Sequence, residues 1–174
     1  MRLVPQRAAG PPGAVVARAG LPRGEKVLAF LPAGDDWLLG TRAAFLLVGP
    51  EAVRRIPWEQ VESLRWDRDE NVLLVSEMGE WGVPRPEHRF PVDGAGRLLE
   101  LMRERVSASV VLQRRVLVTG KRGFNVIARR SPAGGAVSLF VEYDEGVDPE
   151  DPVVLDLVGA AVDEARSEFG PEPG

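Results

Sequence analysis

Short apolar runs, each closed by turn-forming residues, fill the first two thirds of this chain and restrict its fold more than any other feature. Their length, and the Gly, Pro and Asp residues between them, are typical of antiparallel strands. An amphipathic helix follows, because Leu98, Met102 and Val106 recur at helical spacing. We therefore expect seven strands and then a helix. The runs begin near Val27, Trp37, Ala43, Ala52, Val61, Val72 and His88.

The last third of the chain has longer strands. Alternating apolar residues predict strands over 110–118, 124–128 and 137–143. A second amphipathic helix follows, with Asp148 or Asp151 as its N-cap. The sequence thus predicts an α+β fold in three parts. These are a flexible tail over 1–20, a seven-stranded antiparallel barrel with a C-terminal helix over 21–108, and a three-stranded antiparallel meander with a terminal helix over 109–170, packed on the barrel.

The residues that usually carry catalysis are scarce. The chain has no cysteine and one histidine, which excludes a cysteine nucleophile, a disulfide framework and a zinc site built from thiolates. His88 lies in an alternating run with Phe90, the pattern of an ordinary strand residue. No phosphate-binding glycine motif occurs. We expect no catalytic residue, no metal and no cofactor, with Glu142 and Glu145 as the residual candidates for a carboxylate-based activity.

Charge is segregated along the chain, although the net charge is only −4. That total does not favour nucleic acid as a partner. Residues 107–130 carry cations and no acid, whereas residues 142–168 are strongly acidic. Like charges on neighbouring strands destabilise a sheet, so an anion must lie near, either the acidic last helix or a partner. The six cations are Arg114, Arg115, Lys121, Arg122, Arg129 and Arg130.

One stretch and the order of elements carry a family resemblance. Residues 55–61 read RIPWEQV, which resembles the I-P-x-x-x-[VI] stretch of bacterial pleckstrin-homology-like (PH-like) and GRAM-like domains. Residues 103–114, 123–130 and 142–152 resemble an actinobacterial family of unknown activity. The PH-like resemblance implies the barrel over 21–108 and a binding module in place of an enzyme. The loop Pro32–Asp36 is acidic where lipid-binding members carry cations, so their lipid site is not carried over.

These features favour a binding function. Trp81 lies in a loop between glycines and acids, so it either anchors a partner or packs over the barrel mouth. We expect a non-catalytic interaction or scaffolding module that binds a protein through Trp81 and the six cations. The alternative is peripheral binding to an anionic membrane through the basic tail and the hairpin 114–130. No apolar run approaches the roughly 18 residues of a membrane helix, so we expect a cytoplasmic protein; a homo-oligomer is left open.

Overall fold

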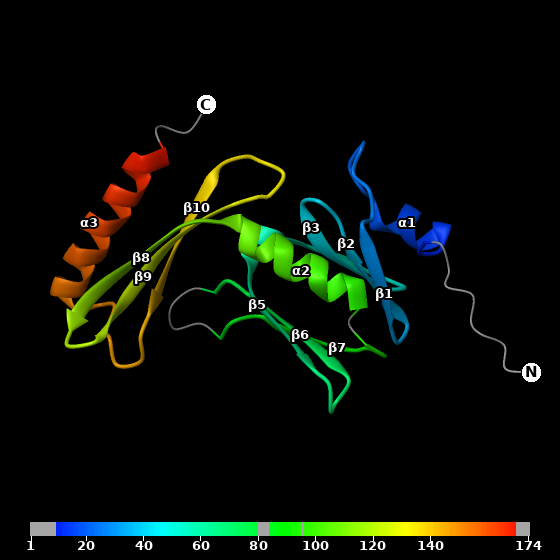
Figure 1. The fold of residues 1–174 in the computed structure, drawn as a ribbon, viewed down its shortest axis with the longest axis horizontal. Coiled ribbons are helices and arrows are strands. Elements are labelled where there is room, and N and C mark those ends of the chain that lie inside the picture. Colours follow the sequence, from blue (N-terminus) through cyan, green and yellow to red (C-terminus); the bar gives the residue numbers. More distant parts are fainter. Residues whose placement is uncertain (1–9, 80–83, 95, 170–174) are drawn as a thin grey trace, which may run out of the picture.

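The computed structural model describes residues 10–79, 84–94 and 96–169. These residues form an α+β fold of three antiparallel sheets and three α-helices (Figure 1). Every predicted strand is confirmed, and so are both predicted helices. The helices are α1 Gly13–Ala19, α2 Gly96–Ser109 and α3 Pro152–Phe169, with a 3-10 turn η1 at Trp58–Gln60. The strands are β1 Ala29–Ala33, β2 Asp36–Gly40, β3 Ala44–Val48, β4 Val53–Pro57, β5 Val61–Asp67, β6 Val72–Glu77, β7 Glu87–Pro91, β8 Val110–Thr119, β9 Arg122–Arg130 and β10 Val137–Tyr143.

The first seven strands form two separate sheets. Strands β1 to β4 pair in chain order, and β5 to β7 do the same in a second sheet. The expected closed seven-stranded barrel is therefore corrected, because no pairing joins β4 to β5 in the described part of the chain. The physical cause lies at Pro57, which ends β4 and is followed directly by the turn η1. This turn redirects the chain before β5 begins.

One hydrophobic core unites the two sheets and α2. Phe45 from the first sheet and Phe90 from the second pack edge to face, with ring centroids 5.8 Å apart. Trp58 of η1 is fully buried beside them, and its indole N–H donates to the Thr41 carbonyl at 3.1 Å. Leu98 and Met102 contribute the apolar side of α2 to the same cluster. Helix α2 thus covers the space between the sheets (Figure 1).

The flexible tail expected over residues 1–20 is corrected for residues 13–19, which form α1. Val15 and Ala19, four residues apart, are buried against the outer face of β2 and β3. Pro12 precedes the helix, and Gly20 ends it in the left-handed conformation. Proline before a helix and glycine after it are ordinary boundary signals. Residues 1–9 lie outside the described part of the chain.

Strands β8, β9 and β10 form the predicted three-stranded meander, in the order β10-β9-β8. Helix α3 packs on one face of this sheet through Val154, Ala161 and Ala165. Asp151 is its cap, since its carboxylate accepts the Val153 N–H at 2.8 Å. β8 begins directly after α2, so the third sheet is attached to the end of the helix that closes the first two (Figure 1).

Candidate functional site: the hairpin cations and the edge of β10

Two of the six cations of the predicted basic hairpin, Arg114 and Arg115, are neutralised by carboxylates of the same chain. Arg114 donates to Glu168 of α3 at 2.6 Å and lies 2.7 Å from the Glu164 carboxylate. The acidic last helix therefore supplies the carboxylates that neutralise Arg114, one of the two alternatives expected from the sequence. Arg115 points to the opposite side of β8, because successive residues of a strand alternate between faces. It pairs with Asp144, just beyond β10, through a hydrogen bond of 2.9 Å.

Asp144 fastens the end of the hairpin to β10. Its carboxylate accepts the Arg115 guanidinium and also the Gly123 N–H, the latter at 2.9 Å. These donors favour the charged carboxylate and lower the pKa of Asp144 to about 2. The Asp144 N–H in turn donates to the Gly123 carbonyl at 2.9 Å. Arg115 is thus part of the framework of the sheet.

Arg129 and Arg130 also separate to opposite faces. Arg129 is only 5% exposed and donates to the Val61 carbonyl of β5 at 2.7 Å, so it joins the third sheet to the second. Burial lowers the pKa of this guanidinium. Arg130, Lys121 and Arg122 are exposed. Trp81 lies outside the described residues. Partner binding by these predicted residues stays a prediction, and Lys121, Arg122 and Arg130 are the exposed cations that the structure leaves for it.

The outer edge of β10 is a feature that the sequence reasoning missed. The bond from Asp144 to Gly123 fixes which β10 residues bond to β9, because bonding pairs recur at every second residue of an antiparallel ladder. Ser138, Phe140 and Glu142 therefore face β9. The backbone N–H and C=O groups of Val137, Leu139 and Val141 point outward, and no described segment pairs with them.

A groove runs along this edge. It has a volume of about 490 Å³, and its far wall is the start of the β6–β7 connection and the end of η1. The Met78 N–H donates to the Gln60 carbonyl at 2.7 Å, so this wall is held by its own backbone bond. Arg130 pairs with Val137 in register, at the end of β9 that adjoins the start of β10. The lining residues are Gln60, Met78, Gly79, Leu139, Phe140, Val141 and Tyr143.

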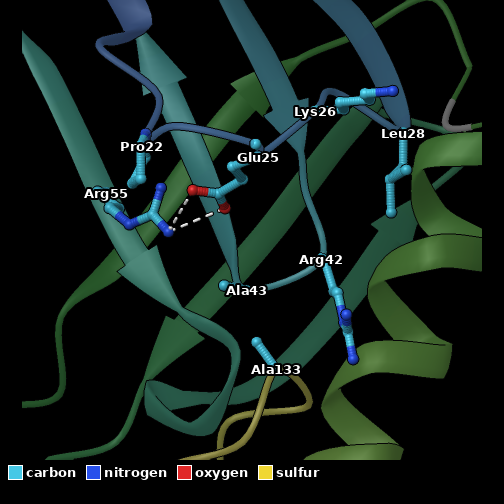
Figure 2. A pocket seen from close by; sticks show the side chains of 9 residues that line it. Pro22, Glu25, Lys26, Leu28, Arg42, Ala43, Arg55 and Ala133 are labelled. Atoms are coloured by element: carbon cyan, nitrogen blue, oxygen red, sulfur yellow. Dashed lines mark hydrogen bonds and ion pairs between the residues drawn. The ribbon is translucent and has the colours of Figure 1, made fainter.

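A second hollow lies beside the first sheet (Figure 2). It is formed by the segment before β1, the β2–β3 turn, β4 and the β9–β10 loop. Arg55 donates to both carboxylate oxygens of Glu25, at 2.9 and 3.0 Å. Burial alone would raise the pKa of Glu25, but the hydrogen bonds from Arg55 and Thr41 outweigh it and lower the pKa. Glu25 therefore stays charged and paired.

The one histidine has a charged neighbour. His88 contacts Glu77 at 2.5 Å, and Arg54 pairs with the same carboxylate, which gives the histidine a structural partner. No group of three or more metal-ligating side chains occurs among the described residues. None of the helices in that part of the chain is long and apolar enough to cross a membrane. No family model, curated protein or solved structure matches this chain.

Proposed function

We propose that the protein is a non-catalytic interaction module that binds an extended segment of another protein along the outer edge of β10. The observation that carries this proposal is the row of outward-facing backbone groups at Val137, Leu139 and Val141 beside a groove. Extended peptides bind other proteins by adding a strand to such an edge. The added strand gains main-chain hydrogen bonds, each contributing a net stabilisation of about 0.5–1.5 kcal/mol.

The composition of β10 supports the same function. Proteins usually protect edge strands with proline, lysine, bulges or a covering segment. Strand β10 has no proline and only one charge, Glu142, and it pairs with β9 without a register shift. All of its residues are partly exposed. A long, regular edge strand without these protections pairs readily with a strand of another chain.

The groove selects the kind of partner. One wall is β10 and the other is Met78 with Gln60, so a segment bound to β10 lies between these two walls. Methionine adapts its shape to different side chains. Alternate residues of the bound segment face Phe140 and Met78, which favours apolar side chains there. Arg130 at the end near Val137 favours an acidic residue in the adjoining part of the partner.

Substituting Leu139 by proline tests the edge directly. Proline removes the outward N–H at this position, whereas the bonds from Phe140 and Glu142 to β9 are kept. We expect binding to weaken about tenfold, since one hydrogen bond is lost and a partner carbonyl is left unpaired. The probe is a phage-displayed library of random peptides, from which bound peptides are selected on the wild-type protein and their affinities measured by calorimetry.

The matched control is Gln113→Pro. Gln113 lies on the opposite edge of the same sheet, in β8, is exposed and also points its N–H outward. Peptides selected on the wild type should bind Gln113→Pro with unchanged affinity. Equal affinity for wild type and Leu139→Pro, with both variants folded by circular dichroism, would place the peptide site elsewhere and contradict the proposal.

We also propose that residues 21–108 are related in fold to the PH-like domains. This proposal is supported by the order of four strands, three strands and a helix, and by the position of RIPWEQV across the end of β4 and η1. The membrane alternative has less support, because Arg114, Arg115 and Arg129 are engaged within the chain. Flotation with anionic vesicles at physiological salt, absent with neutral vesicles and lost on substituting Lys121 and Arg122, would favour it instead.

A further inference from the structure

The hollow of Figure 2 has a surplus of positive charge. Its single carboxylate, Glu25, is taken up by Arg55 and Thr41. Two further cations line the same hollow, Lys26 and Arg42. Both are exposed, and no carboxylate within the described ranges forms an ion pair with either. The hollow therefore attracts an anion. One of the two cations comes from the β2–β3 turn and the other from the segment before β1.

The remaining lining is apolar. Pro22, Leu28, Ala43 and Ala133 contribute hydrocarbon surface. Leu28 is 41% exposed, a high value for a large apolar side chain. The Leu28 N–H donates to the Gly40 carbonyl of β2 at 2.8 Å. This bond fixes the backbone of Leu28 beside β2. Apolar surface beside unpaired cations suits a ligand that has both a hydrocarbon part and an anionic end.

The size of the hollow limits the ligand to a small molecule. Its volume is about 480 Å³, within the range of roughly 300–1,000 Å³ for small-molecule sites. Ala133 brings the β9–β10 loop to its rim (Figure 2), so a bound ligand contacts both the first and the third sheet regions. A planar guanidinium such as that of Arg42 matches a carboxylate through two parallel hydrogen bonds.

We propose that this hollow binds a small amphipathic carboxylate, an apolar chain that ends in a carboxyl group. Arg42 holds the carboxylate, and Lys26, whose side chain points away from Arg42 (Figure 2), adds positive charge to the hollow. The surface of Leu28, Pro22 and Ala133 holds the chain. The site is separate from the groove of β10, since the two share no lining residue. It is therefore independent of the proposed peptide binding, and each proposal fails or succeeds by its own experiment.

Hexanoate is the probe, with acetate and 1-hexanol as ligands that keep only the charge or only the chain. Binding to the full chain is followed by backbone amide chemical shifts of Gly24, Lys26, Ala43 and Ala133. We expect saturable shifts with hexanoate, and at least fivefold weaker binding of both acetate and 1-hexanol. Arg42→Gln should weaken hexanoate at least fivefold, because the exposed guanidinium is lost without change to the core.

The matched control is Arg89→Gln, which removes an exposed arginine of β7 that does not line the hollow. Its affinity for hexanoate should equal that of the wild type. Leu28→Ser provides a second test, and it should weaken hexanoate while leaving acetate unchanged. The proposal is overturned if hexanoate gives no saturable shift, if 1-hexanol binds equally well, or if Arg42→Gln and Arg89→Gln behave alike.

Discussion

Substituting Gly123 by alanine is expected to destabilise the protein by about 3 kcal/mol, the upper end of the usual cost of overpacking. A Cβ atom at Gly123 would lie 1.8 Å from the Val116 carbonyl oxygen and 2.8 Å from its carbonyl carbon. Both atoms belong to the backbone of β8, which cannot yield as a flexible side chain does. The register shift between Leu117 and Thr119 brings β8 this close.

The backbone of β9 cannot move away either. The Gly123 N–H is bonded to the Asp144 carboxylate, and its carbonyl accepts the Asp144 N–H. Relief of the clash therefore breaks the connection to the end of β10 or the pairing of β8 with β9. We expect a lower midpoint of urea unfolding and faster amide exchange across the third sheet.

Gly159→Ala is the matched control for this substitution. Gly159 lies in α3, and a Cβ atom there meets nothing within 4 Å. Alanine inside a helix is more stable than glycine by roughly 0.5–1 kcal/mol, so this variant should be slightly more stable than the wild type. An unchanged unfolding midpoint for Gly123→Ala would show that the strands are not packed as closely as the structure has them.

Substituting Arg129 by alanine is expected to cost about 2–4 kcal/mol of unfolding free energy. Its guanidinium bonds to the Val61 carbonyl at 2.7 Å and lies 3.4 Å from the Ser109 hydroxyl. The side chain thus connects β9 to the start of β5 and to the end of α2. Alanine leaves a cavity where the three elements meet, and it removes the bond to Val61.

Two variants separate this connecting role from the effect of charge. Arg130→Ala removes the neighbouring exposed cation and should change stability by less than about 0.5 kcal/mol. Arg129→Lys keeps the charge but not the planar geometry, so it should fall between the wild type and Arg129→Ala in urea unfolding. Equal stability of Arg129→Ala and Arg130→Ala would mean that Arg129 is not buried between the sheets.

The sequence predicted the strands well because each strand is local: its apolar alternation and turn residues lie within a few positions. The mistaken closed barrel came from a relation between strands. Whether β4 pairs with β5 depends on the path through Pro57 and Trp58, which alternation does not encode. Helix α1 was missed because a seven-residue helix has little periodicity to detect, although Pro12 and Gly20 mark its ends.

The separation of the hairpin cations could have been predicted from the sequence. Adjacent residues of a strand face opposite sides, so Arg114 and Arg115 cannot share one surface, and the same holds for Arg129 and Arg130. The structure divides them accordingly between α3, Asp144, the buried junction and solvent. The burial of Arg129 was not predictable, because it depends on how the third sheet packs against Val61. The position of β10 at an edge of its sheet was predictable from the meander order.

Amide hydrogen exchange along β10, residue by residue, tests the proposed function most directly. The proposal predicts slow exchange at Phe140 and Glu142, whose N–H groups are bonded to β9, and fast exchange at Leu139 and Val141, whose N–H groups face the groove. Addition of a selected peptide should then slow Leu139 and Val141 without altering Gln113 on the opposite edge. Uniformly slow exchange along β10 in the free protein would show that this edge is already paired and would contradict the proposal.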